Sequence, residues 1–192
     1  VDLALAADPN LLGEKTKSTH YKKGKDPYAI RDLTRAGESV PNIRVPRYNV
    51  NAEFEQWVKE NIVEHFTEAS ISISSTYAGS LGAHSDRKRD YGLLYVVRQG
   101  GPDVRTVFYQ QKSHPVIRNR YVSIDDYDQL DVIDVADFGI YQWALLDARI
   151  LHSVENVVDQ RISFQISIDR DLTELSNRTM VLPPNQVEVD PV

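Results

Sequence analysis

The sequence that decides the fold runs from residue 70 to residue 86 and reads Ser-Ile-Ser-Ile-Ser-Ser-Thr-Tyr-Ala-Gly-Ser-Leu-Gly-Ala-His-Ser-Asp. Residues 70–77 alternate polar and apolar side chains with a period of two, which predicts a β-strand. Glycines then predict a turn, and the pair His84-x-Asp86 opens the next predicted strand. Side chains at i and i+2 of a strand point to the same face, so this imidazole and this carboxylate can be directed at one point.

His84 and Asp86 form one half of a candidate metal site, because non-haem iron accepts neutral ring nitrogens and carboxylate oxygens. The alternative is a structural pair on an ordinary strand. A second histidine, His152, ends an apolar run, and Arg161 and Ser163 follow in a strand of alternating character. Two histidines and one carboxylate make a facial triad that leaves the opposite side of an octahedron open for substrates. The order of these residues therefore favours a metal centre with open coordination positions.

Short β-runs separated by turns continue from this stretch to about residue 170. The later predicted strands cover residues 91–97, 104–111, 121–124, 131–135, 139–146, 149–154 and 161–169. Gly100-Gly101-Pro102-Asp103 predicts one of the turns between them. Such a series predicts an antiparallel sandwich or barrel, and a jelly roll of about eight strands fits it best.

One amphipathic helix is predicted before these strands, over residues 51–69. Asn51 can cap this helix, and we expect it to buttress a sheet, with His65 in a structural position. The apolar stripe of the helix consists of Phe54, Trp57, Val58, Ile62 and Phe66.

The chain as a whole predicts a single domain over residues 1–192. Residues 1–50 show no sustained period and predict an irregular arm or a lid over the site. Residues 70–170 form the predicted core, and residues 171–192 are polar and predict a C-terminal extension.

Composition narrows the class of protein. The 192 residues are 41% hydrophobic and 26% charged, as in an ordinary globular domain. The lack of cysteine excludes disulfides, thiolate nucleophiles and cysteine-ligated metal sites, and it fits a cytoplasmic location. A formal net charge of -6 argues against broad binding to nucleic acid. No apolar run approaches the ~20 residues of a membrane-spanning helix, so no membrane association is expected. The oligomeric state stays open.

The spacing of the candidate residues resembles the Fe(II)/2-oxoglutarate-dependent oxygenase superfamily over roughly residues 70 to 170. The residues that carry the resemblance are, in order, Tyr77, His84, Asp86, His152, Arg161 and Ser163. The short chain and tyrosine-rich core are similar to the prolyl-hydroxylase-like branch. Many members of that branch have Lys at the position of Arg161, which argues against a peptidyl-proline substrate. The resemblance implies a double-stranded β-helix, the jelly-roll core of cupin-like proteins.

The resemblance also implies a role for each residue. His84, Asp86 and His152 would hold Fe(II), with three positions left for 2-oxoglutarate and dioxygen. Arg161 would bind the far carboxylate of 2-oxoglutarate, because a guanidinium offers a planar fork that matches a carboxylate. Ser163 lies two residues on, hence on the same strand face, and would add a hydroxyl group to that carboxylate. The reaction would hydroxylate a C–H bond and release succinate and CO2.

Tyr77 would add a hydrogen bond from its phenol to the co-substrate, and its alternative is a packing role at the edge of the core. The substrate would be a small molecule or a peptidyl group. The run Arg87-Lys88-Arg89, together with Arg118 and Arg120, is interpreted as a solvated charged surface. The alternative is a basic rim around the site, which would select an anionic substrate.

Two other functions remain open. A metal enzyme on a cupin-like barrel that does not use 2-oxoglutarate would have no need of Arg161 and Ser163. A non-catalytic jelly-roll binding module would keep only the fold. Asp147 is a spare carboxylate with an expected structural role, and Tyr95 and Tyr109 are expected to pack in the core.

Overall fold

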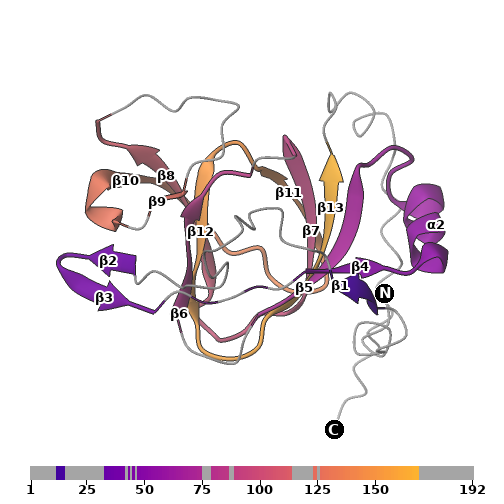
Figure 1. Ribbon diagram of the computed structural model, residues 1–192, viewed down its shortest axis with the longest axis horizontal. Coiled ribbons are helices and arrows are strands. Elements are labelled where there is room, and N and C mark those ends of the chain that lie inside the picture. Colours follow the sequence, from indigo (N-terminus) through magenta and orange to yellow (C-terminus); the bar gives the residue numbers. More distant parts are fainter. Residues whose placement is uncertain are drawn as a thin grey trace, which may run out of the picture.

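Two antiparallel β-sheets face each other and enclose the centre of the molecule (Figure 1). The computed structural model describes residues 12–15, 33–41, 43, 45, 47–74, 79–86, 89–113, 123–124 and 126–168. The six-stranded sheet has the order β1 (Leu12–Lys15), β4 (Arg47–Val50), β5 (Glu68–Ile73), β13 (Ile162–Ile168), β7 (Tyr91–Arg98) and β11 (Trp143–Asp147). The five-stranded sheet has the order β10 (Leu130–Ala136), β8 (Arg105–Gln111), β12 (Leu151–Val157), β6 (Gly79–His84) and β9 (Ser123–Ile124).

The strand pairing is that of a jelly roll. Going inward from both ends of the core, β5 pairs with β13, β6 with β12, β7 with β11, and β8 with β10. The chain therefore behaves as one long hairpin rolled into two sheets, which is the double-stranded β-helix. The predicted fold class is confirmed, and the four pairs contain the eight strands expected of the core.

The helix α2 (Ala52–Asn61) is shorter than the predicted 51–69. Asn51 caps it as predicted, because its side chain accepts a hydrogen bond from the Phe54 amide at 2.8 Å. The chain leaves the helix after Asn61, and β5 begins at Glu68. Phe66 still packs on the same hydrophobic core from the connecting segment, which explains why the helical spacing continues in the sequence beyond the helix.

Hydrophobic packing covers the outer face of the six-stranded sheet. Phe54 of α2 stacks on Phe164 of β13 with ring centroids 5.0 Å apart. Val58, which is fully buried, belongs to a cluster with Ile166 and Ile168 of the same strand. The helix therefore buttresses the sheet, as predicted, and Figure 1 shows α2 outside β5 and β13.

The outer face of the five-stranded sheet is covered by the hairpin of β2 (Leu33–Arg35) and β3 (Glu38–Val40) and by the short 3-10 helix η2 (Tyr127–Gln129). The hairpin turn has positive φ angles at Ala36 (51°) and Gly37 (76°), as a tight two-residue turn between twisted strands requires. These strands, with β1 and β4, lie in a segment that was predicted to be irregular. That prediction is wrong for the described residues, because pairing with distant strands supplies the order that the local pattern lacks.

An ion pair between exposed Arg35 and buried Glu155 fastens the hairpin to the five-stranded sheet. Arg35 Nη2 donates to Glu155 Oε1 at 2.6 Å, and Arg35 Nη1 donates to Oε2 at 3.2 Å. The Tyr109 hydroxyl also donates to Glu155, which is 1% exposed. Burial raises the pKa of this carboxyl group, but these hydrogen bonds outweigh burial and hold it below its usual value. The ionised carboxylate therefore belongs to the folded state.

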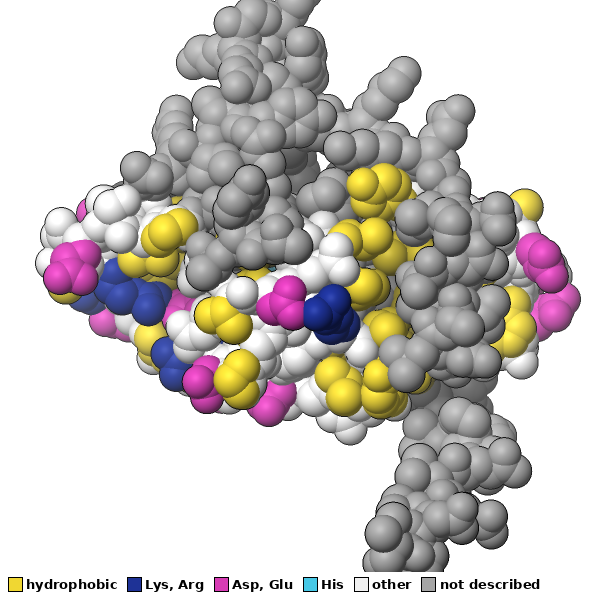
Figure 2. Space-filling model, turned by 90° about the horizontal axis from the view of Figure 1, so that it is seen from below, with side chains coloured by type: hydrophobic (Ala, Val, Ile, Leu, Met, Phe, Trp, Pro, Cys, Tyr) yellow, Lys and Arg dark blue, Asp and Glu magenta, His cyan; other side chains and the backbone are white. Residues whose placement is uncertain are grey.

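Exposed hydrophobic side chains lie scattered among charged ones on the face shown in Figure 2. Among the described residues, the large exposed ones are Trp57, Val132, Ile133, Val135, Ile140, Tyr141, Leu145 and Val158. Val132, Ile133 and Val135 belong to β10, at the edge of the five-stranded sheet. In the part of the chain that the structure describes, no helix has the length and apolar character needed to cross a membrane.

Candidate metal centre and pocket

Antiparallel pairing brings the two predicted histidine ligands side by side. His84 is the last residue of β6, His152 is the second residue of β12, and the two are paired directly across the ladder. Their ring centroids are 4.7 Å apart. Asp86 lies just beyond β6, and its Oδ1 is 3.8 Å from His84 Nε2. The motif therefore closes a strand, whereas the sequence predicted that it opens one, and Asp86 lies next to His84.

Both histidines have the same hydrogen-bonding arrangement. Nδ1 of His84 lies 2.8 Å from the Gly82 carbonyl, and Nδ1 of His152 lies 2.8 Å from the Ile150 carbonyl. A carbonyl only accepts, so each Nδ1 carries the proton and each Nε2 keeps its lone pair. Burial lowers the pKa of His152 to about 4 and also lowers the pKa of His84. Two neutral imidazoles with unprotonated Nε2 atoms result.

Arg89 binds and orients the carboxylate of Asp86. Nε and Nη2 of Arg89 each lie 2.6 Å from Asp86 Oδ2, while Oδ1 is on the side of His84. Burial raises the pKa of Asp86, but the nearby Arg89 and the histidines outweigh it and hold that pKa well below its usual range. Among the described residues, no group of three His, Cys, Asp or Glu side chains is arranged closely enough to hold a metal ion. The donor types themselves, two imidazole nitrogens and one carboxylate oxygen, fit Fe(II).

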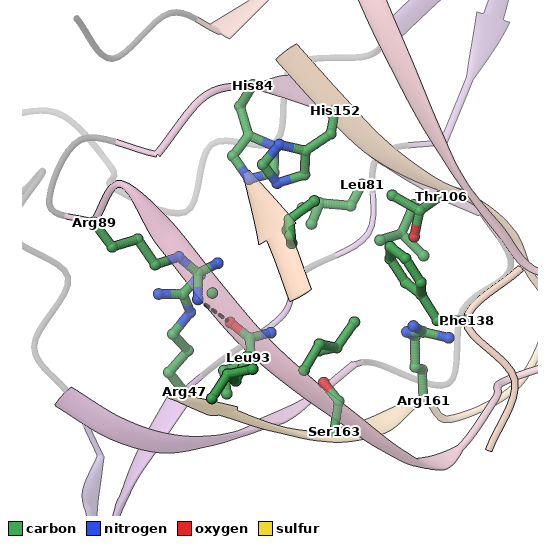
Figure 3. Close-up of a pocket in the computed structure, with 15 residues that line it drawn as sticks. Arg47, Leu81, His84, Arg89, Leu93, Thr106, Phe138, His152, Arg161 and Ser163 are labelled. Carbon is green, nitrogen blue, oxygen red and sulfur yellow. Dashed lines mark hydrogen bonds between the residues drawn. The ribbon is translucent and has the colours of Figure 1, made fainter. Parts of the chain in front are cut away.

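The histidines stand at one end of a pocket between the two sheets (Figure 3). Its empty volume is about 510 Å³, including the part open to solvent. The pocket is lined by Arg47, Leu81, His84, Arg89, Gly92, Leu93, Leu94, Thr106, Phe138, Leu146, His152, Val154, Arg161, Ser163 and Gln165.

Arg161 and Ser163 lie in this same pocket, as the sequence predicted for a shared strand face. Nη1 of Arg161 donates to the backbone carbonyl of Gln99 at 3.1 Å and to its side-chain Oε1 at 3.3 Å. Both acceptors are neutral. Burial lowers the pKa of Arg161 to about 10, so the guanidinium stays charged at neutral pH. A buried cation with neutral hydrogen-bond partners is suited to bind an anion.

The inner face of the six-stranded sheet is polar. Ser163 pairs with Ser72 and Gln165 pairs with Ser70, and residues paired across a ladder share a face. Both serines of β5 are 2% exposed, and the hydroxyl oxygen of Ser72 has no hydrogen-bond partner among the described residues. Buried polar groups are normally satisfied, so this surface is suited to contact a bound molecule. The hydrophobic packing lies instead on the outer faces of the sheets.

Two further arginines, Arg47 and Arg89, line the pocket. Arg47 of β4 pairs with Ser72 and therefore points into the same interior. Arg89 was assigned to a solvated charged run, with a basic rim around the site as the alternative; it is 7% exposed and lines the pocket, so the solvated interpretation is wrong for this residue. Gly92 leaves the space for it, because a Cβ at this position would lie 3.2 Å from Arg89 Nη1. The spacing of Arg89 three residues after Asp86 was the one local signal for this contact.

Other predicted residues lie away from the pocket or outside the described residues. The carboxylate of Asp147 accepts from Arg149 Nη2 at 2.7 Å, which agrees with a structural role. Tyr95 packs against Trp143 with ring centroids 5.1 Å apart, as expected for a core residue. His65 is exposed. The predicted residues that fall outside the described part of the chain are Tyr77, Arg87, Lys88, Arg118 and Arg120.

Comparison with known proteins finds similarity at the level of structure. No family model matches the chain, and no curated protein matches it by sequence. A solved oxidoreductase of the 2OG-Fe(II) oxygenase family from Burkholderia pseudomallei is 10% identical, with a TM-score of 0.43 over 73% of this chain and 76% of that one. A cupin superfamily protein from Desulfitobacterium hafniense is 7% identical, with a TM-score of 0.32 over 73% of this chain and 97% of that one.

A third similar structure is that of CapF, which is 9% identical with a TM-score of 0.35. The match covers 66% of this chain and only 28% of CapF. Similarities with TM-scores below 0.5 carry no argument about activity, so the fold rests on the strand pairing described above. The chain is a cupin-like jelly roll with a polar, cation-rich interior.

Proposed function

We propose that the protein is a non-haem Fe(II)/2-oxoglutarate-dependent dioxygenase that hydroxylates a C–H bond of a small-molecule or peptidyl substrate. One observation carries the proposal. Two imidazoles, His84 and His152, line the same pocket as a buried guanidinium and a serine hydroxyl, Arg161 and Ser163, and the Asp86 carboxylate lies beside His84. This pairing of a metal-ligand corner with a carboxylate-binding group is what a chelating keto acid with a second carboxylate requires.

At the metal end, Nε2 of His84, Nε2 of His152 and Oδ1 of Asp86 would hold Fe(II). The backbone carbonyls that accept from each Nδ1 keep the imidazoles in the ligating tautomer. Arg89 keeps Oδ2 of the carboxylate occupied, so one oxygen remains for the metal. Bound Fe(II), with 2-oxoglutarate and dioxygen, would supply the oxidising power that converts C–H to C–OH, with succinate and CO2 as products.

At the other end, Arg161 would donate two parallel hydrogen bonds to the far carboxylate of 2-oxoglutarate, and Ser163 would donate a third. The acceptors on Gln99 orient the guanidinium before the co-substrate binds. Leu81 and Val154 line the pocket together with these residues, and such apolar side chains would exclude water around the carbon chain. The protein's contribution is thus to position the co-substrate and to keep the reacting centre dry.

The test is an anaerobic titration of the metal-free protein with Fe(II) and 2-oxoglutarate, followed by visible absorption. The expected result is a weak charge-transfer band that requires both additions. His152→Ala should lose the band and the iron affinity, whereas Arg161→Gln should keep iron binding and require much more 2-oxoglutarate. Arg98→Gln is the matched control, because Arg98 is exposed and pairs with Asp159 at the surface.

Each other outcome points to a different function. Iron binding without a band would overturn the assignment of Arg161 and favour a cupin-like metal enzyme that does not use 2-oxoglutarate. A lack of metal binding would overturn the metal centre and favour a jelly-roll binding module. If the band forms, release of succinate can then be used to screen substrates.

A further inference from the structure

Gln99 holds the Arg161 guanidinium by one of its three nitrogens. Arg161 lies at the end of the pocket away from the two histidines (Figure 3). Its Nη1 donates to the backbone carbonyl of Gln99 at 3.1 Å and to the side-chain oxygen Oε1 of Gln99 at 3.3 Å. Nε and Nη2 have no hydrogen-bond partner within the described part of the chain. These two nitrogens share one edge of the guanidinium and form a planar fork, so this edge is available to a carboxylate.

The amide of Gln99 could face Arg161 with its oxygen or with its nitrogen, and two acceptors decide between these orientations. Nε2 of Gln99 donates to the backbone carbonyl of Val104 at 3.0 Å and to Oδ1 of Asp137 at 3.1 Å. A carbonyl and a carboxylate only accept hydrogen bonds, so both match the amide nitrogen. A reversed amide would place its donors against those of the guanidinium. Asp137 therefore helps to turn Oε1 of Gln99 toward Arg161.

Asp137 is oriented by the turn that joins β10 to β11. Its Oδ1 also accepts a hydrogen bond from the Gly139 amide at 2.8 Å. The turn is anchored to β7, because the Tyr141 amide donates to the Val96 carbonyl at 2.8 Å. Gly139 has a φ of 61°, a left-handed conformation that glycine adopts without strain. The carboxylate of Asp137 is thus directed at Gln99 before any ligand binds.

Asp137 also acts on Arg161 through its charge. Burial lowers the pKa of Arg161 to about 10, and the negative charge of Asp137 opposes this shift. The same negative charge would repel a carboxylate bound at Arg161. The hydrogen bond of Asp137 and its charge therefore act on an anionic ligand in opposite directions, so substitutions can separate them.

We propose that Asp137 is a positioning residue for the co-substrate, which holds the Gln99 amide so that the Nε–Nη2 edge of Arg161 faces the far carboxylate of 2-oxoglutarate. This inference rests on the proposed function, since it concerns the same carboxylate site. Asp137 does not line the pocket, whereas Arg161 does. The contribution of Asp137 therefore reaches the ligand through Gln99 and Arg161 in turn.

Calorimetric titration of 2-oxoglutarate into protein loaded anaerobically with Mn(II) tests the inference. Asp137→Ala should weaken binding by about three- to tenfold, the range expected for one hydrogen bond. Asp137→Asn should bind at least as tightly as wild type, because its amide oxygen still accepts from Gln99 and the repelling charge is gone. If Asp137 acted by its charge alone, Ala and Asn would both strengthen binding, which would overturn the inference.

A double-mutant cycle with Gln99→Met shows whether the effect passes through Gln99. Met is unbranched and lacks the amide, so Gln99→Met should weaken binding about as much as Asp137→Ala. The double variant should bind like Gln99→Met alone. Asp137 precedes Phe138, which lines the pocket, and a loss that acted through Phe138 would persist in the Gln99→Met background and overturn the inference. Asn51→Ala is the control for stability, because it removes a helix cap and should leave the affinity for 2-oxoglutarate unchanged.

Glutarate, titrated into the metal-free protein, separates a failure of this inference from a failure of the proposed function. Glutarate is a dicarboxylate without the keto group, so it tests the carboxylate site at Arg161 without a metal. If wild type and Asp137→Ala bind 2-oxoglutarate equally well, the inference fails and the proposed function stands. If wild type binds glutarate but not 2-oxoglutarate, and Asp137→Ala and Arg161→Gln both weaken glutarate, the proposed function fails and the role of Asp137 stands. Binding of neither ligand would overturn both.

Discussion

Replacing Arg161 by Met should stabilise the metal-free protein while it abolishes tight binding of 2-oxoglutarate. Arg161 is 8% exposed, and burial lowers its pKa from 12.5 to about 10, so the folded protein disfavours its positive charge. At about 1.36 kcal/mol per pKa unit, this drop corresponds to roughly 3 kcal/mol of unfolding free energy. Met is an unbranched side chain that can fill the same space without a charge.

Part of that gain is offset by lost hydrogen bonds. The guanidinium donates to two oxygens of Gln99, and a buried acceptor that loses its partner costs about 1 kcal/mol. The net expectation for Arg161→Met is a gain of about 1 kcal/mol, or about 2–4 °C in melting temperature for a chain of this size. An arginine retained for binding is expected to lower the stability of the folded protein in this way, whereas an arginine with a structural role would raise that stability.

Thermal and urea unfolding of the metal-free proteins measure this difference, and calorimetry of the Mn(II)-loaded proteins measures binding of 2-oxoglutarate. Arg98→Met is the matched control, because that side chain is 51% exposed and its replacement should change stability by no more than about 0.5 kcal/mol. The reasoning is refuted if Arg161→Met unfolds at a lower temperature than both wild type and the control. It is also refuted if the variant binds 2-oxoglutarate as tightly as wild type.

Three further variants test other parts of the structure. Arg89→Gln should weaken Mn(II) binding by about 10–100-fold in a metal titration, because Asp86 loses the group that orients it; unchanged affinity would remove Arg89 from the site. Glu155→Gln should lower the unfolding free energy by about 1–3 kcal/mol at pH 7, because it breaks the ion pair with Arg35. The pKa of the Glu155 carboxyl group is lower in the folded than in the unfolded protein. The ionised carboxylate therefore stabilises the fold at pH values above its unfolded pKa, and this stabilisation is lost as the pH falls through its folded pKa. Urea unfolding should therefore show the two proteins converging in acid, and a difference that persists there would contradict the ionised pair. Asn51→Ala should cost about 1 kcal/mol in the same assay, and no cost would show that the cap of α2 contributes nothing.

Local patterns in the sequence located most of the core strands. The strand predicted over 91–97 is Tyr91–Arg98, and the one predicted over 104–111 is Arg105–Gln111. Each has its own period or apolar run and its own flanking turn, so neighbouring residues carry the information. His84 and His152 were proposed as ligands in the same way, from their residue types and order, and the structure pairs them across β6 and β12.

Patterns that depend on distant contacts were misjudged. The apolar stripe from Phe54 to Phe66 predicted one helix, but the helix ends at Asn61 and Phe66 reaches the same hydrophobic core from the connecting segment. The spacing of the apolar residues shows only that Phe54 and Phe66 face the same hydrophobic core. Where the backbone leaves the helix is decided by the pairing of β5 with β4 and β13, which are distant in the sequence.

The sequence by itself determined where most of the core strands lie along the chain, the residue types of a candidate metal site and the position of Arg161 and Ser163 on one strand face. Only the tertiary structure decided which other charges enter the pocket. Arg47 comes from a segment without any period, and its place follows from the register of β4 against Ser72. Arg89 is buried because Asp86 and Gln165 hydrogen-bond to its guanidinium. The cost of burying a charge depends on partners that folding brings from elsewhere, so no local pattern can reveal it.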